Sequence, residues 1–100
     1  MLEVSNLVND NGNAAANQFV INDGKKTVFQ SYSSRIACLK NGKVTIVPDA
    51  VQPIGDTLQS SHTTRKHLYI FLRDHCGQSI YNIDELRRAI KNGYIKVGRF

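Results

Sequence analysis

The stretch from Gln18 to Pro48 constrains the fold of this chain more than any other part of the sequence. It contains three runs rich in β-branched and aromatic residues: 18–22, 27–39 and 43–47. Two short sequences separate the runs, Asn22-Asp23-Gly24 and Asn41-Gly42, and both consist of residues that tolerate the positive φ of a tight turn. The stretch therefore predicts consecutive β-hairpins.

The middle run carries more polar residues than a buried strand needs. Five of them fall on both of its faces: Gln30, Ser31, Ser33, Ser34 and Arg35. The Ser33-Ser34 pair predicts a bulge or a bend in a strand that would otherwise be too long. We expect the polar side chains to face solvent or to hydrogen-bond a nearby loop or helix cap, for which Thr63 and Thr64 are candidates.

Two amphipathic helices are predicted in the C-terminal part. The first begins at Thr63 or Thr64, where a side-chain oxygen can accept from a free amide of the first turn, and runs to about His75. The second begins with a capping box, Asn82 to Glu85, and stops at Asn92-Gly93. Residues 94–97 alternate like a final edge strand. The connection 49–62 is either a binding loop or an ordinary crossover.

These elements predict a single α+β domain over residues 1–100. A small antiparallel sheet of three to four strands, with its β-hairpins at 18–48, packs against the two C-terminal helices. Residues 2–8 form a short strand or a docked arm. The expected core consists of apolar residues at strand or helix spacing: Phe19, Ile21, Val28, Ile36, Cys38, Val44, Ile46, Leu68, Phe71, Leu72, Leu86 and Ile90.

The sequence also indicates a compartment. No apolar run approaches the roughly 18 residues that a membrane span needs, and the N-terminus has neither the basic start nor the apolar block of a signal peptide. We therefore expect an intracellular protein with no membrane partner. Its two cysteines, Cys38 and Cys76, are then expected to be free thiols, with Cys38 a small core residue.

The formal charge of +5 is unevenly distributed along the chain. Residues 1–64 contain equal numbers of basic and acidic residues, so the whole excess belongs to residues 65–100. This excess indicates either a solvated helix surface or a basic face that binds nucleic acid or an acidic protein. The candidate binding residues are the cations of this region and a tyrosine suited to stacking on bases: Arg65, Lys66, Tyr69, Arg73, Arg87, Arg88, Lys91 and Lys96.

Catalytic and metal signatures are missing from the sequence. The three histidines, His62, His67 and His75, do not have the paired spacing of a compact zinc motif. Serines, cysteines and histidines occur, but no nucleophile-elbow motif, paired-carboxylate pattern or phosphate-binding glycine loop surrounds them. We therefore expect a binding protein that is not an enzyme and has no cofactor. The sequence does not separate a protein partner from a nucleic-acid partner.

Three strings in the chain resemble a family of small uncharacterised proteins from tailed bacteriophages. They are N-Q-F-V-I at 17–21, F-Q-S-Y-S-S-R-I-A at 29–37 and T-T-R-K at 63–66, and the resemblance covers roughly residues 4–97. The connection at 51–55 departs from the family pattern. The family has no established activity, so the resemblance supplies no catalytic residues.

The resemblance does imply a biological setting. Small phage proteins are often accessory factors that bind host machinery, defence complexes or nucleic acid in the host cytoplasm. This implies a host protein or ribonucleoprotein complex as the partner, and an inhibitor of a CRISPR-type defence nuclease complex is one concrete form. The alternative is a nucleic-acid-binding protein that uses the basic C-terminal helices.

Overall fold

The computed structural model describes residues 2–48, 53–54, 57–58 and 62–100. Its elements, in chain order, are β1 (Glu3–Val8), β2 (Ala14–Asn22), β3 (Lys26–Ser31), β4 (Ser34–Lys40), β5 (Lys43–Ile46), β6 (Pro53–Ile54), β7 (Thr57–Leu58), α1 (His62–Asp74), α2 (Ile83–Lys91) and β8 (Ile95–Val97). The predicted connection 49–62 lies largely outside the described residues. Within it, β6 and β7 form a separate antiparallel pair.

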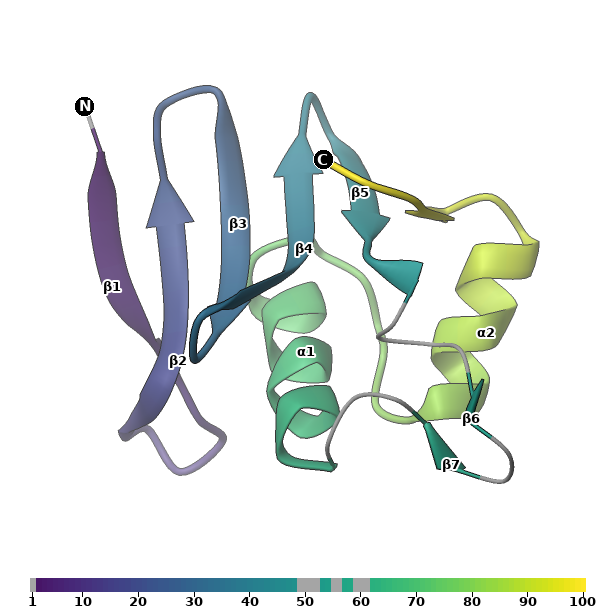
Figure 1. Ribbon diagram of the computed structural model, residues 1–100, viewed down its shortest axis with the longest axis horizontal. Coiled ribbons are helices and arrows are strands. Elements are labelled where there is room, and N and C mark those ends of the chain that lie inside the picture. The colour runs from purple at the N-terminus through teal and green to yellow at the C-terminus, as the bar shows by residue number, and fades with distance from the viewer. Residues whose placement is uncertain (1, 49–52, 55–56, 59–61) are drawn as a thin grey trace.

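The α+β class is confirmed, but the prediction of three to four antiparallel strands is wrong. Among the described residues, six strands form one sheet in the order β1-β2-β3-β4-β5-β8. Strands β1 to β5 are antiparallel neighbours, whereas β8 pairs with β5 in parallel, so the sheet is mixed. The parallel pair exists because α2 returns the chain to the free edge of β5 (Figure 1).

The two turns read from the sequence are confirmed. At the β2–β3 turn, Asp23 Oδ1 accepts hydrogen bonds from the amides of Lys25 and Lys26, each at 2.9 Å. At the β4–β5 turn, Asn41 and Gly42 have φ values of 53° and 75°, which suits their two-residue connection. Both turns lie at the same end of the sheet (Figure 1).

The run 27–39 is a third hairpin and not one bent strand. It divides into β3 and β4, which pair with each other around Tyr32 and Ser33, with a register shift at Phe29 and Gln30. Tyr32 takes a φ of 55°, a value uncommon for a bulky residue, and its amide donates to the Asn17 carbonyl at 2.7 Å. A turn without glycine leaves little trace in the sequence, so only a bulge or a bend was predicted.

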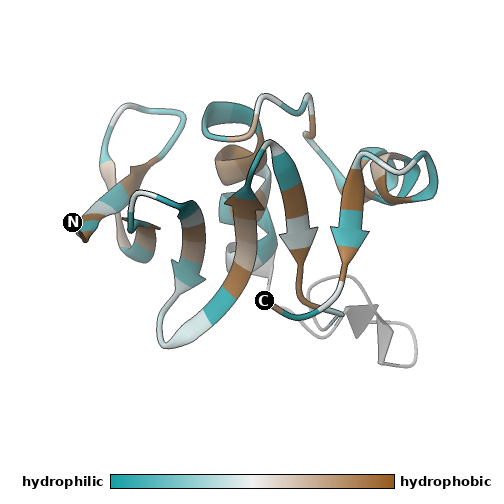
Figure 2. Ribbon diagram, turned by 90° about the horizontal axis from the view of Figure 1, so that it is seen from above, coloured by the Kyte–Doolittle hydropathy of each residue, from teal (hydrophilic) through white to brown (hydrophobic). Residues whose placement is uncertain are grey.

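Both helices cover one face of the sheet, and no helix of the described residues lies on the other face (Figures 1 and 2). The covered face carries residues that lie side by side in register, Val20, Phe29, Ala37 and Ile46, and all four are buried. The Phe29 ring stacks on Phe71 of α1, with centroids 5.6 Å apart. The core therefore fills the space between the sheet and the helices.

Two predicted core residues lie elsewhere. Phe19 and Ile21 are half-buried on the face without helices, because β2 turns Gln18 and Val20 toward the helices. Ile90 is also only half-buried and packs at the margin of the core. Val28 and Cys38 are buried as predicted, but on the open face, whereas the other seven positions lie in the main core.

Local hydrogen bonds fix where helix α2 begins. Asn82 Oδ1 accepts from the Glu85 amide, and Glu85 Oε1 accepts from the Tyr81 amide, each at 2.9 Å, so the predicted capping box is confirmed. Helix α1 begins at His62, which makes Thr64 a residue of its first turn and not the cap. No described helix is long and apolar enough to cross a membrane.

Candidate nucleic-acid interface

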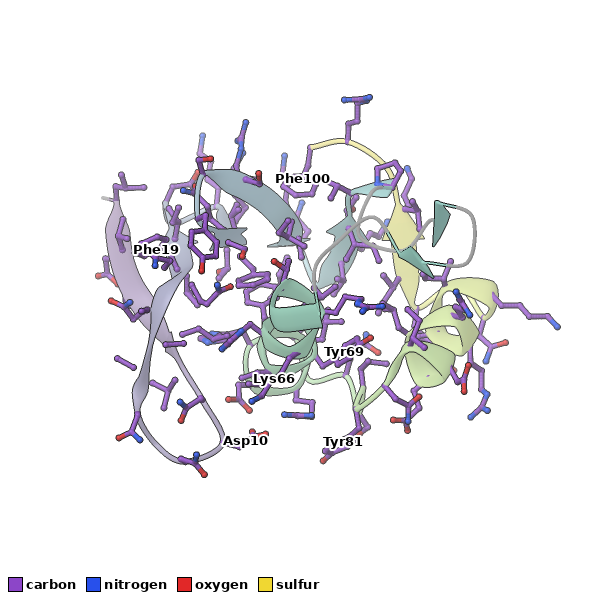
Figure 3. The ribbon with its side chains drawn as sticks, turned by 60° about the horizontal axis from the view of Figure 1, so that its bottom comes forward. Asp10, Phe19, Lys66, Tyr69, Tyr81 and Phe100 are labelled. Carbon is purple, nitrogen blue, oxygen red and sulfur yellow. The ribbon has the colours of Figure 1, made fainter. Side chains whose placement is uncertain are left out.

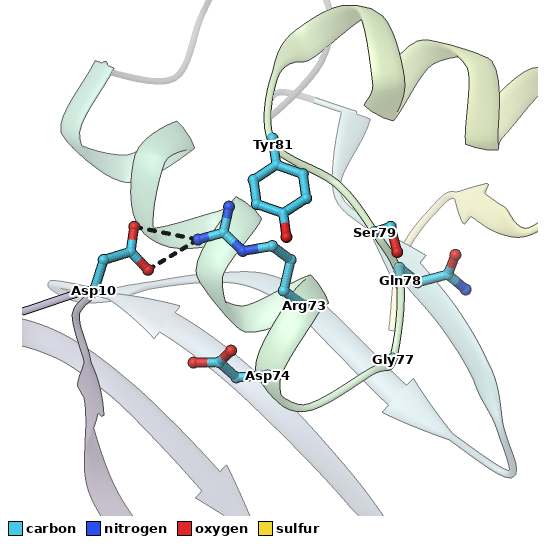
Figure 4. Close-up of a pocket in the computed structure, with 7 residues that line it drawn as sticks. All are labelled: Asp10, Arg73, Asp74, Gly77, Gln78, Ser79 and Tyr81. Atoms are coloured by element: carbon cyan, nitrogen blue, oxygen red, sulfur yellow. Dashed lines mark hydrogen bonds and ion pairs between the residues drawn. The ribbon is translucent and has the colours of Figure 1, made fainter. Parts of the chain in front are cut away.

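Arg73, one of the predicted binding residues, already holds several parts of the fold together. Its Nη2 lies 3.1 Å from Asp10 Oδ1, and its Nη1 donates to the Ile80 carbonyl at 3.3 Å. The guanidinium also lies 4.4 Å from the ring centroid of Tyr81 (Figure 4). Arg73 therefore connects the β1–β2 turn to the segment between the helices, and its charge is matched within the molecule.

An open depression of about 520 Å³ surrounds this arginine (Figure 4). Its lining is polar and comes from the β1–β2 turn, the end of α1 and the segment between the two helices: Asp10, Arg73, Asp74, Gly77, Gln78, Ser79 and Tyr81. The two carboxylates outweigh the single guanidinium. The depression is therefore poorly suited to phosphate.

Three further predicted residues meet between α1 and α2. Burial raises the pKa of the half-buried Tyr69, while the nearby charges of Arg65 and Arg87 lower it and Asp84 raises it. The Arg65 Nε is buried and has no hydrogen-bond partner among the described residues. These contacts make Arg65 and Tyr69 part of the helix packing, and Asp84 offsets part of the local positive charge.

The other predicted residues are exposed, but they do not share one surface. Lys66 lies on α1 on the same side as Tyr69 (Figure 3), and Arg87, Arg88 and Lys91 lie on α2. Lys96 lies in β8 beside Thr45, on the sheet face that the helices leave open. Lys96 therefore does not share a face with the candidates on the helices, because its strand β8 belongs to the sheet.

The helix side of the molecule has mixed charge. Its cations are interspersed with four acidic residues from the β1–β2 turn and the two helices: Asp10, Asp74, Asp84 and Glu85. Mixed charge of this kind solvates a helix surface and gives only a weak field toward a polyanion.

The open sheet face carries an uninterrupted row of cations that sequence reasoning missed. In the register of β3, β4 and β5, Lys26 lies beside Lys40 and Lys40 beside Lys43. We call these three residues the lysine row. Side chains directly opposite each other on neighbouring strands have Cβ atoms roughly 5 Å apart, and like charges at this separation destabilise the sheet.

An apolar strip runs beside the lysine row. Across β2, β3 and β4, Ile21, Val28 and Cys38 lie next to one another in register. Val28 is only 4% exposed and Cys38 only 3%, although no described helix covers them. Neighbouring side chains must cover them, and the C-terminal residues also lie on this face (Figures 2 and 3). Long lysine stems can do this while their ammonium groups remain in water.

The cations surround this strip. Burial raises the pKa of the Cys38 thiol, and the positive charges of Lys26, Lys40 and Arg35 lower it. Asp23 also acts on Cys38, but its carboxylate accepts two backbone hydrogen bonds in the turn. We call the whole set the sheet-face basic surface: Lys26, Arg35, Lys40, Lys43 and Lys96 around the strip.

The three strings of the resemblance meet at one corner of the fold. Ser31 and Thr64 share a hydrogen bond of 3.1 Å between their hydroxyl oxygens, which confirms that part of the polar run bonds to the start of a helix. Gln18 is paired with Ser31 in register and is buried. Ser33, Ser34 and Arg35 are exposed, which confirms the other expectation, that some polar side chains of this run face solvent.

The two cysteines are free, as predicted. Burial raises the pKa of Cys76 to about 12, and it also raises that of Cys38. Because only the thiolate reacts with a disulfide reagent, we expect both thiols of the folded protein to react with Ellman's reagent at pH 8 roughly 100-fold more slowly than in denaturant. Rapid reaction of one thiol without denaturant would contradict this burial.

One of the three histidines packs against an aromatic ring. His75 stacks on Phe71, with ring centroids 5.4 Å apart. Within the described ranges, no three His, Cys, Asp or Glu residues are grouped so that they could hold a metal ion.

Comparison with known proteins gives a family but no activity. No curated protein and no solved structure matches the chain. A family model matches residues 2–87, which include the lysine row and the corner formed by Gln18, Ser31 and Thr64. The chain therefore belongs to the family of unknown function DUF8033.

Proposed function

We propose that this protein binds nucleic acid, without catalysis, through the sheet-face basic surface. The observation that carries the proposal is the lysine row, in which Lys26, Lys40 and Lys43 occupy adjacent positions on three neighbouring strands. Such a row costs folding stability through repulsion, and phosphate groups would relieve that repulsion. Binding of a polyanion would also release its condensed counterions.

The surroundings of the row favour the same ligand. Both helices lie on the opposite face, and Lys40 and Lys43 are exposed, so a ligand can reach this part of the row beside the C-terminal residues (Figure 2). Lys96 and Arg35 extend the positive charge along and across the sheet. Asp10 lies with Arg73 on the helix side, and Asp23, at the β2–β3 turn, offsets only part of the positive charge of this surface.

The resemblance to tailed-phage proteins supplies a biological setting for this proposal. An accessory protein in the host cytoplasm that binds nucleic acid could act on a host ribonucleoprotein, including a CRISPR-type nuclease complex. A basic surface would act there by occupying the nucleic acid itself, whereas a mimic of that nucleic acid would be acidic.

A second candidate function is binding to a host protein through α2. The observation that favours it is the exposure of Arg87, Arg88 and Lys91 along this short helix. These residues form a compact basic ridge of the kind that an acidic protein surface fits.

A matched pair of charge-reversal variants tests the two candidates. The sheet variant combines Lys40→Glu, Lys43→Glu and Lys96→Glu, and the helix variant combines Arg87→Glu, Arg88→Glu and Lys91→Glu. Both change the net charge equally, and all six positions are exposed. We expect the sheet variant to weaken binding of a fluorescent oligonucleotide about 100-fold at low salt, because roughly three phosphate contacts are lost.

The salt dependence gives an independent readout. The slope of log Kd against log salt concentration should fall by roughly 2 in the sheet variant, at about 0.7 for each lost contact to a single strand. The helix variant should change affinity by only a few-fold. Equal losses in both variants would show that net charge and not the lysine row controls binding. Loss of a host-protein complex in the helix variant alone would support the second candidate.

A further inference from the structure

We infer that the sheet-face basic surface is built for single-stranded nucleic acid and not for a duplex. This inference rests on the proposed function and specifies its ligand. It comes from the order of three parallel rows on the open face, which run across the strands and follow one another from the turn end of the sheet inward.

The first row is cationic, and the second is largely apolar and buried. Lys26, Lys40 and Lys43 form the lysine row, and two residues further along each strand lies the row that includes Val28, Cys38 and Thr45. Two residues of a strand span roughly 7 Å. Val28 and Cys38 are buried, so this row is a spacer that sets the third row four residues, roughly 13 Å, from the lysine row. A single strand whose phosphates contact the lysine row can therefore reach the third row with the base of a following nucleotide.

The third row supplies an aromatic ring and polar groups. Phe19, Gln30 and Arg35 lie side by side in register on β2, β3 and β4. Phe19 is half-buried and points away from the helix layer (Figure 3), while Arg35 is exposed. An aromatic ring and a guanidinium both stack on bases, and the guanidinium can also donate hydrogen bonds to base edges.

A duplex cannot use this arrangement. Its phosphates lie on the outside and its bases are stacked and paired inside, so contact with the lysine row would leave Phe19 and Arg35 without a base to stack on. A single strand separates its phosphates from its bases and can lay them on the first and third rows. An acidic protein would complement the charge of the lysine row, but it has no bases to stack on the ring and guanidinium of the third row.

The test measures fluorescence anisotropy of the full chain with three labelled probes: a 15-nucleotide oligothymidylate, a 15-nucleotide oligouridylate and a 15-base-pair duplex. We expect at least one single strand to bind about 10-fold more tightly than the duplex at equal salt. Phe19→Leu should weaken single-strand binding about 5-fold or more, because one stacked base contributes roughly 1–3 kcal/mol. Duplex binding should remain unchanged, and Phe19→Tyr, which keeps a ring, should bind like the natural chain.

Circular dichroism would establish that Phe19→Leu is folded. If it is not, Arg35→Gln at an exposed position serves in its place and should also weaken single-strand binding selectively. Equal affinity for duplex and single strand would overturn this inference, and the proposed function would still stand if the sheet variant weakened both. Binding of none of the three probes would overturn the proposed function itself.

Discussion

Replacing Phe71 by alanine is expected to lower the free energy of unfolding by about 4 kcal/mol. Phe71 is completely buried, and its ring stacks on Phe29 from the sheet. Its loss would leave a cavity where α1 meets the sheet. A domain of this size has a total stability of roughly 5–15 kcal/mol, so the variant would be close to unfolding at 37 °C. Urea unfolding followed by far-ultraviolet circular dichroism measures the change.

Phe19→Leu is the matched control for this prediction. Phe19 is half-buried on the open face, and leucine keeps most of its apolar volume, so its cost should stay below about 1.5 kcal/mol. A cost for Phe71→Ala no larger than that of the control would contradict the assignment of Phe71 to the main core.

Local chemistry made the turns and helices predictable. Asn41-Gly42 and Asn82 to Glu85 each specify their own backbone through hydrogen bonds or a positive φ within a few residues. The face that β2 buries was not predictable in this way. Phe19 and Ile21 lie on one face of β2, and Val20 lies on the other. Only the pairing of Val20 with Phe29 shows that Val20, and not the two larger residues, faces the helices.

The candidate surface depends on contacts that sequence spacing does not show. The pairing of Lys40 with Lys43 follows from the two-residue turn and was within reach of sequence reasoning. Lys26 joins them only through the β3–β4 pairing, whose turn at Tyr32 has no glycine. Lys96 reaches the same face through a parallel strand that follows α2. The distribution of charge along the chain therefore predicted a binding surface on the helices and not on the sheet.

Replacing Gln18 by methionine is expected to raise the free energy of unfolding by about 1–2 kcal/mol. Gln18 is 1% exposed, and neither its amide nitrogen nor its amide oxygen has a hydrogen-bond partner among the described residues. A buried polar group without a partner costs roughly 1–3 kcal/mol, whereas an apolar side chain of similar length avoids this cost. The midpoint of urea unfolding, at an unchanged slope, measures the gain.

Ser31→Ala is the control at the neighbouring position. Its hydroxyl does bond to Thr64, so its removal should lower stability by about 1 kcal/mol and not raise it. A loss of stability in Gln18→Met would mean that the buried amide is satisfied by a group such as an ordered water.

A gain of stability in Gln18→Met would indicate that the corner formed by Gln18, Ser31 and Thr64 has a functional role in addition to its role in packing. Two residues next to it, Asn17 and Tyr32, hold left-handed backbone conformations, with φ values of 62° and 55°. Strained backbone and unsatisfied buried groups are retained where function needs them. The orphan amide lies in β2 next to Phe19, so a variant that is more stable but binds single strands less tightly would link this corner to the binding face. Unchanged binding would show that the loss of folding stability caused by Gln18 has no connection with binding.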